Sequence, residues 1–494
     1  MRPRWRAGVL AAAGAATLLA GCGIRVAAKP SPSPSPARPA SMVASRASPA
    51  ASPAASPAPP VATPSPSPPL EVPPAAPTVA PSVRPAPGTS GRRASALADA
   101  ARRVAAAAAV RSALPAFDQL VASMVARSGV PGAAVAVVAG DTAMYTRSFG
   151  LREIGRPAPV DDDTLFQLGA VSGAYTTTML AALAGEGELI RWDQPVRRVW
   201  SGFRLRDPWA TREATFRDLT AGRSGLPAHA GAELLAFGYG RAEVLRRLRR
   251  LRPAAGFRAE FAPQDGMVTG AAAAAEHATG RSWARLVREH VLDPVGDEGT
   301  VLTWRGFRRA ADRATPHRLV DGTMTPQDPA DQTVFAPALG VGASLSGLVT
   351  FARLQLNGGA VGGVRVAPAG LLAQTLRPAT AVADTPSGPE AAAPGWMLST
   401  FDGRLLASAE GGLASGSSAT VTLLPDDGVA VIVLANAYPE GAALGRAIAR
   451  TLTDLAVFGA PQEDWLVREQ ATLAAERAAE PAAGLVLPPR AAAA

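Results

Sequence analysis

The chain has 494 residues, of which 48% are hydrophobic and 18% charged, and its formal net charge is +9. Cys22 is the only cysteine, which excludes an intramolecular disulfide, and Lys29 is the only lysine, so the positive charge is almost entirely arginine. The 46 prolines are unevenly spread, so the folded part is shorter than the chain. No nucleic-acid-binding module is recognisable, and we expect no nucleic-acid partner.

Residues 1–21 have the layout of a secretory signal peptide. Three arginines precede an apolar run over residues 7–20, which is too short to span a bilayer comfortably. The run ends in LAGC, which resembles the bacterial lipobox, where cleavage precedes the cysteine and its thiol receives a diacylglycerol. We therefore expect an exported protein that is anchored to a bacterial membrane through lipidated Cys22 and faces the extracytoplasmic side. We find no other candidate membrane span.

Residues 22–94 are dominated by Pro, Ser and Ala, as in SPSPSPARP. Proline fixes φ and removes an amide donor, and the segment offers few large apolar groups to bury. The composition predicts a disordered tether. It either holds the domain away from the membrane or has no role beyond its length.

A globular domain is predicted over residues 95–458, followed by a C-terminal helix and tail over 459–494. Its first part shows helical spacing over 95–127, a strand pair at 133–140 and 142–150, and a helix over 170–186. The middle of the domain, about 200–330, is predicted to be mostly helical and rich in loops.

Two strands, at 419–425 and 429–436, flank the turn Asp426-Asp427-Gly428, and helices follow at 440–457 and 462–480. Strands at both ends with helices between them predict an α/β fold. In that fold one sheet is built from both ends of the domain and carries a helical insert.

Five segments, in order, resemble the β-lactamase-related serine hydrolases, a family that includes class C β-lactamases, penicillin-binding D,D-peptidases and related esterases. The segments are VPGAAVAVVAGD…RSFGLREIGRP (130–157), TLFQLGAVSGAYTTTMLAALAGEGELIRWDQPV (164–196), DLTAGRSGLP (218–227), GASLSGLVTFARLQLNGG (342–359) and PDDGVAVIVLAN (425–436). The resemblance implies an α/β sandwich with an all-helical subdomain.

The family's first catalytic motif, Ser-x-x-Lys, places an amine beside the nucleophilic hydroxyl on one helix face. The matching residues here are Ala170 and Gly173, which carry neither group. Ser172 is two positions from Ala170, on another face of the helix, and we expect it to be structural.

The second and third family motifs also match residues of different chemistry. Pro263 and Asp265 stand where the family has Tyr and Asn, and Glu410 begins the Glu-Gly-Gly that matches His-x-Gly and ends at Gly412. The resemblance implies a pocket that includes these residues and Ser224. Asp265 and Glu410 would make it acidic, either as solvated acids or as a pair for acid–base chemistry.

The four histidines, His229, His277, His290 and His317, show no metal-ligand spacing, and we expect neither metal nor cofactor. The basic run VLRRLRRLRP (244–253) either contacts anionic polymer or lipid, or packs through its leucines with a solvated arginine face.

The residues at the motif positions favour a non-catalytic binding or scaffolding protein of the cell envelope, with a cell-wall component or envelope protein as partner. The first alternative is a hydrolase, of peptidase, esterase or amidase type, with a rewired acidic site at Asp265 and Glu410. The second is a serine hydrolase that uses a serine beside His229 or His317.

Overall fold

The protein is described by a computed structural model that covers residues 89–187, 189–385 and 388–479. The predicted signal peptide, Cys22 and most of the tether lie outside the described residues. The first helix, α1 (Thr89–Ser128), begins before the domain boundary predicted at residue 95.

One eight-stranded sheet forms the centre of the domain, and all neighbouring strands in it are antiparallel. Strands from the two ends of the domain meet in it, because β1 pairs with β14 from Ala133↔Ala435 to Ala139↔Val429, which confirms the prediction of a shared sheet. In order across the sheet the strands are β2 (Thr142–Gly150), β1 (Gly132–Ala139), β14 (Val429–Ala435), β13 (Ser417–Leu424), β12 (Arg404–Leu413), β11 (Trp396–Phe401), β10 (Gly388–Ala393) and β9 (Thr380–Thr385).

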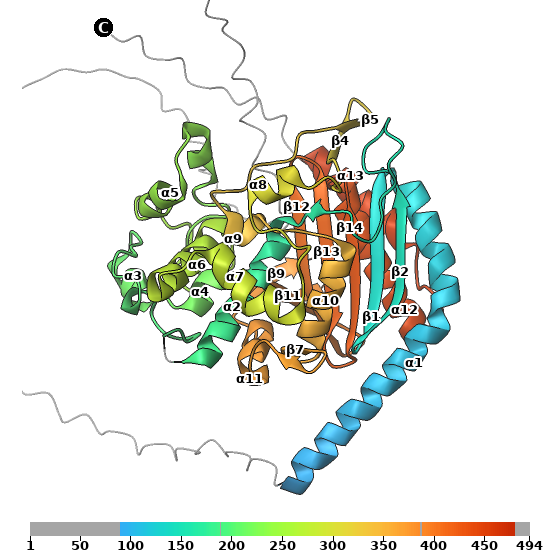
Figure 1. Cartoon of the computed structure of the whole chain (residues 1–494), viewed down its shortest axis with the longest axis horizontal. Helices are drawn as coiled ribbons and strands as arrows, with labels where there is room; N and C mark the ends of the chain where they lie inside the picture. The colour runs from blue at the N-terminus through green and yellow to red at the C-terminus, as the bar shows by residue number, and fades with distance from the viewer. Residues whose placement is uncertain (1–88, 188, 386–387, 480–494) are drawn as a thin grey trace, which may run out of the picture. The chain divides into compact units, whose positions relative to one another are not determined.

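Helices cover both faces of this sheet, as Figure 1 shows. Strand β1 (GAAVAVVA) is buried along its whole length, with alternate residues in two separate cores. The first core contains α2 (Ser172–Glu186) and α10 (Leu345–Leu356), and the second contains α1, α12 (Glu440–Phe458) and α13 (Trp465–Ala479). The result is the predicted α/β sandwich.

The chain between β2 and β9 is mostly helical and forms the predicted helical subdomain. Its helices are α3 (Pro208–Glu213), α4 (Phe216–Thr220), α5 (Arg241–Leu248), α6 (Asp265–Thr279), α7 (Trp283–Val287), α8 (Trp304–Arg309), α9 (Ala336–Leu339) and α11 (Ala369–Leu372). Short strand pairs join β3 (Phe166–Gln167) to β6 (Gly342–Ala343), β4 (His317–Val320) to β5 (Thr323–Pro326) and β7 (Ala360–Val361) to β8 (Val364–Arg365).

Within the described part, one helix segment, Ala96–Ser128, is long and apolar enough to cross a membrane by length and composition alone. The sequence had predicted no membrane span after the signal peptide. Val110, Phe117 and Val121 from it are buried in the second core against the sheet. The second half of α1 therefore serves as a packed helix of the domain.

Backbone atoms of β12 and of the turn before α2 make a close contact. A Cβ added at Gly411 of β12 would lie 1.8 Å from the carbonyl oxygen of Leu168 and 2.7 Å from the amide nitrogen of Ala170. Real Cβ atoms do not approach backbone so closely, so this contact requires a glycine. It fixes the turn before α2 against the sheet.

We expect Gly411→Ala to lower the free energy of unfolding by about 3 kcal/mol, because the added methyl must displace backbone on one side of the contact. Gly173→Ala is the matched control, since a Cβ there meets no atom within 4 Å. That variant should be unchanged or up to about 1 kcal/mol more stable. Urea denaturation of both variants measures the difference, and equal stabilities would contradict the close contact.

Candidate functional site

The turn that begins α2 forms one side of the candidate site. The 3-10 turn η1 (Gly169–Val171) leads directly into the helix, and Gly169 adopts a positive φ of 55°. Ala170 is partly exposed in this turn, and the space around the missing Cβ of Gly173 is empty. At these two positions the chain supplies a methyl group and a hydrogen.

Ser172 lies between these residues but is fully buried. Its hydroxyl oxygen accepts a hydrogen bond of 3.0 Å from the amide of Val341. The hydroxyl therefore joins two elements of the core, and does not face the open turn.

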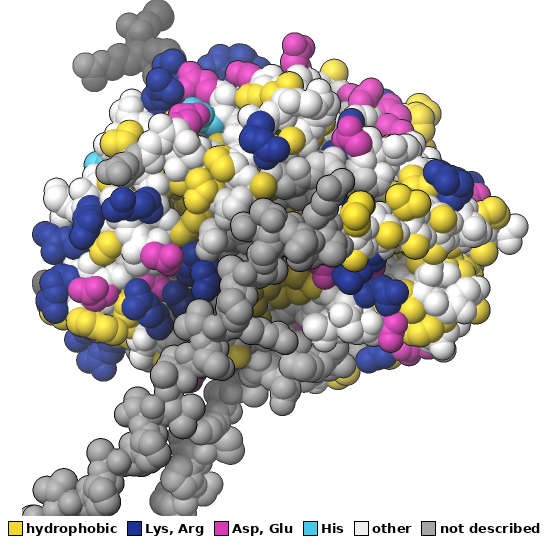
Figure 2. All heavy atoms as spheres, turned by 90° about the horizontal axis from the view of Figure 1, so that it is seen from below, with side chains coloured by type: hydrophobic (Ala, Val, Ile, Leu, Met, Phe, Trp, Pro, Cys, Tyr) yellow, Lys and Arg dark blue, Asp and Glu magenta, His cyan; other side chains and the backbone are white. Residues whose placement is uncertain are grey.

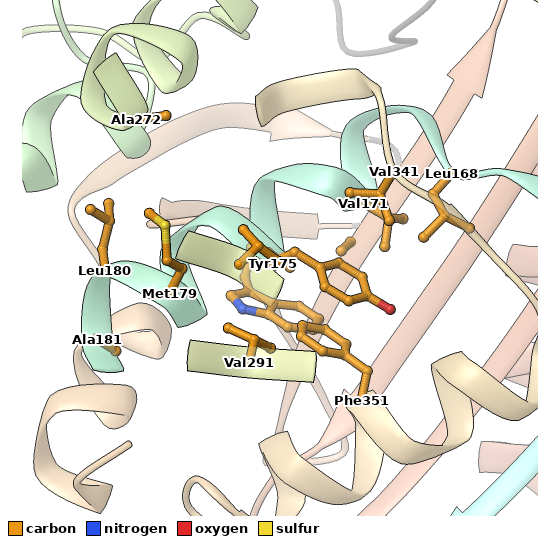
Figure 3. Packing of buried hydrophobic residues seen from close by; sticks show 14 of the residues in the cluster. Leu168, Val171, Tyr175, Met179, Leu180, Ala181, Ala272, Val291, Val341 and Phe351 are labelled. Carbon is orange, nitrogen blue, oxygen red and sulfur yellow. The ribbon is translucent and has the colours of Figure 1, made fainter. Parts of the chain in front are cut away.

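The next turn of α2 is packed into the first core. Tyr175 stacks on Phe351 of α10, with ring centroids 4.0 Å apart and an interplanar angle of 14°, beside Val171 and Val341 (Figure 3). Burial raises the pKa of the Tyr175 phenol well above its usual range. This tyrosine is a packing residue and is not available as a general base.

The loop before α6 and the first residue of that helix carry the second set of predicted site residues. The carbonyl of Pro263 accepts a 2.8 Å hydrogen bond from the amide of His229. The side chain of Gln264 accepts from the Ser224 hydroxyl at 2.7 Å and donates to the carbonyl of Leu226 at 2.6 Å. Ser224 is buried, so its hydroxyl ties this loop to the preceding turn.

Asp265, the first residue of α6, pairs with His229, and the distance from Oδ2 to Nδ1 is 3.0 Å. The hydrogen bond from Asp265 raises the pKa of His229, against the opposing effect of burial. The two side chains are 19% and 14% exposed, so solvent reaches the pair. The two residues are 36 positions apart, so the sequence alone did not predict that they form a pair.

Glu410 does not belong to this site, and its prediction as a pocket residue is wrong. Its carboxylate accepts a 3.0 Å hydrogen bond from Arg446 of α12, which also binds Glu469 of α13 at 2.7 Å. Those helices pack on the second core. Side chains alternate along a strand, so Glu410 faces them while Gly411 faces the turn at Ala170.

Gly412 points the same way as Glu410, since a Cβ on it would meet the ring of Tyr438 at 2.0 Å. Its amide nitrogen nevertheless lies beside the turn, 3.0 Å from the position that a Cβ on Gly169 would take, so Gly412 stays a predicted site residue through its backbone. The backbone of Gly411 and Gly412 is therefore the part of this motif that faces the turn, and Asp265 and Glu410 do not form one acidic pair.

A buried ion cluster that the sequence analysis missed fixes the segment DLTAGRSGLP. Asp218 is fully buried and accepts hydrogen bonds from Arg223 at 2.6 Å, from Arg258 at 2.9 and 2.7 Å, and from Thr215. Burial raises the pKa of this carboxyl, but the hydrogen bonds outweigh it and hold the pKa below its usual value. The charged groups of this segment therefore serve the fold.

His317, the other histidine considered beside a serine, is part of the core. His317 is fully buried, its Nε2 accepts a hydrogen bond from the amide of Ile154, and burial lowers its pKa. Within the described ranges, no serine hydroxyl hydrogen bonds to His229 or His317. Across the same residues, no group of three or more His, Cys, Asp or Glu is arranged to hold a metal ion.

The sequence and the fold of this chain are similar to those of known proteins. Residues 117–476 match the family described as Beta-lactamase, and the chain belongs to the beta-lactamase family. It is 30% identical over 321 residues to penicillin-binding protein 4 of Amycolatopsis lactamdurans, covering 62% of this chain and 81% of that protein. It is 26% identical over 360 residues to unguisins hydrolase ungD' of Aspergillus campestris, covering 71% of this chain and 67% of that protein.

A solved structure shares the fold. The octameric penicillin-binding protein homologue from Pyrococcus abyssi has a TM-score of 0.62 and 18% identity to this chain, covering 72% of this chain and 80% of that one. The resemblance to β-lactamases and penicillin-binding proteins is thereby confirmed for the fold and the family.

We expect Asp265→Asn to lower the pKa of His229, because the substitution removes the carboxylate that favours the imidazolium. A histidine whose pKa is raised on folding stabilises the fold below its unfolded pKa of about 6.5, and that contribution is lost as pH rises through the folded pKa. The variant should therefore lose more stability at pH 6 than at pH 9. NMR titration of the imidazole protons measures the pKa directly.

The other three histidines provide the internal control in the same spectra, since none of them contacts Asp265. An unchanged His229 titration in the Asp265→Asn protein would show that the pair is not formed in solution.

Proposed function

We propose that this member of the beta-lactamase family is an exported, lipid-anchored pseudoenzyme that binds a ligand or partner at the cell envelope without forming a covalent intermediate. The observation that carries the proposal is Ala170. It is the partly exposed residue of the turn at the start of α2, against the backbone of Gly411, and its side chain ends in a methyl group.

Acyl transfer through a covalent intermediate needs a nucleophile and a base that activates it. Gly173 has no side chain, and the hydroxyl of Ser172 is occupied by the amide of Val341. The only lysine, Lys29, belongs to the predicted tether. These three facts support binding over acyl-enzyme chemistry.

Hydrolysis by another route is the second candidate. A histidine held by a carboxylate is the usual arrangement of a general base, and His229 and Asp265 have it. One relative is named as a hydrolase. A rewired site of this kind would act on water directly and would leave no adduct on the protein.

The purified protein should show no mass increase after incubation with a fluorescent penicillin or a fluorophosphonate, because neither reagent finds an activated nucleophile. Intact mass spectrometry reads the result. A stoichiometric adduct with either reagent would overturn the proposal, and peptide mapping would identify the nucleophile.

Accessibility of the turn is the control for that result, and cysteine reactivity in a Cys22→Ser background measures it. Ala170→Cys should react with iodoacetamide, because residue 170 is partly exposed. Ser172→Cys should resist the reagent, because that position is fully buried. If both resist, the absence of an adduct reflects a cleft that the reagents do not enter. Separately, hydrolysis of a chromogenic ester that is abolished by His229→Gln would favour the second candidate.

The lipid anchor is a separate part of the proposal and rests on the LAGC sequence at residues 19–22. We expect the mature protein from membranes to carry diacylglycerol on Cys22, and Cys22→Ser to release it to the soluble fraction. Mass spectrometry of the N-terminal peptide tests this. Membrane retention of the Cys22→Ser protein would show that something other than the lipid holds it, with the segment Ala96–Ser128 as the region to examine.

A further inference from the structure

A cavity of about 370 Å³ opens in the helical subdomain, away from the turn at Ala170. Its walls come from the segment after η2 (Val196–Arg198), from α5 and from the C-terminal half of α6. Ala273 and His277 are eight and twelve residues after Asp265 on α6, which places them about 12–18 Å along the helix axis from the start of α6. The cavity is therefore distinct from the candidate site.

One wall of this cavity is aromatic and apolar. The rings of Trp200 and His277 stack with centroids 5.0 Å apart and an interplanar angle of 24°. Leu245 of α5 lies beside them and is 9% exposed. A volume of this size and a wall of this kind suit a small organic ligand with a flat apolar body.

The other walls carry positive charge. Arg204, Arg241, Arg246 and Arg249 line the cavity, whereas Glu276 is the one acidic residue among the lining residues. Arg246 pairs with Glu243 and Arg241 pairs with Glu276. Within the described part of the chain, Arg204 and Arg249 have no carboxylate partner.

Arg241 is held in place by its neighbours in the fold. Nη1 of Arg241 donates to Oε1 of Glu276 at 3.1 Å, and the same oxygen accepts from the amide of Trp283 at 2.6 Å. Nη2 of Arg241 is buried and has no hydrogen-bond partner among the described residues. Through its bond to Glu276, Arg241 is therefore engaged by the fold, and Arg204 and Arg249 are the lining arginines left to meet an anion.

Arg246 and Arg249 belong to the basic run VLRRLRRLRP (244–253), whose sequence allows two roles. The apolar residues of α5, Val244, Leu245 and Leu248, are buried. The apolar side of the run therefore packs on the subdomain, as the second of the two interpretations predicted. Figure 2 shows arginine side chains gathered at the left-hand end of the molecule, where Figure 1 places α3, α5 and α6. The polar side of α5 thus borders a cavity as well as solvent.

We propose that this cavity binds a small organic anion. Its flat apolar body lies against Trp200 and His277, and its phosphate or carboxylate group is held by the arginines, above all Arg204 and Arg249. This inference does not depend on the proposed function of the Ala170 site.

The test is calorimetric titration of the full mature protein with 1-naphthyl phosphate and with 1-naphthoate. At least one of them should bind saturably with one site per chain. Neutral 1-naphthol lacks the charge and inorganic phosphate lacks the ring, so each should bind at least tenfold more weakly, about the contribution of a charge-assisted hydrogen bond. Raising the salt concentration should weaken the binding of the anions.

Variants locate the site. Arg249→Gln and Arg204→Gln should each weaken binding about tenfold. Ala242→Trp should abolish it, because Ala242 is an exposed residue of the cavity lining and the indole would fill the space. Arg250→Gln is the matched control, since Arg250 is exposed on the same segment and does not line the cavity. All four proteins should melt close to the wild-type temperature.

The proposal would be overturned by the absence of saturable binding of both naphthyl anions. It would also be overturned if Arg250→Gln weakened binding as much as Arg249→Gln, which would indicate nonspecific attraction to a basic surface. Equal affinity for 1-naphthol would show an apolar pocket without anion recognition.

Discussion

The backbone contact between Gly411 and the turn from Leu168 to Ala170 is the constraint on which the candidate site depends. It brings β12 against the start of α2 with no side chain between them. Because strand side chains alternate, the same contact turns residues 410 and 412 toward the opposite face, where Arg446 binds Glu410. The contact involves main-chain atoms, so it can persist whatever side chain stands at position 170. This chain can therefore keep the fold of the family although the side chains at its motif positions differ.

The polar groups of the segment 218–227 and of the loop before α6 are mostly engaged in holding the fold. Asp218 is enclosed by Arg223 and Arg258, and the Ser224 hydroxyl is bonded to Gln264. The His229–Asp265 pair differs from these, because both side chains retain some exposure. A site with a rigid frame and few free reactive groups is suited to recognition, which agrees with the proposed binding role. The arginine-lined cavity at Trp200 would give the helical subdomain a second recognition site.

Much of the sheet was predictable, and the reason lies in its sequence. The run GAAVAVVA and the run VAVIVLA have the continuous apolar character of strands buried on both faces, and the structure places them side by side as β1 and β14. Strands β9 to β12 were not predicted. Segments such as RLLASAEGGL are rich in Ala, Ser and Gly, which have weak β-propensity, so pairing with neighbouring strands decides their conformation. The α1 helix likewise begins earlier than composition suggested.

The sequence alone determined which reactive groups the chain possesses: Ala170 and Gly173 at the first motif position, Pro263 at the second, and one lysine in the predicted tether. Residue identity is local, and no folding event can add a hydroxyl or an amine. The tertiary structure alone decided that Glu410 points to Arg446, that His229 meets Asp265, and that arginines of α5 border the Trp200 cavity. These are contacts between residues distant in sequence, and they depend on strand pleat and helix packing, which a motif aligned along one chain does not specify.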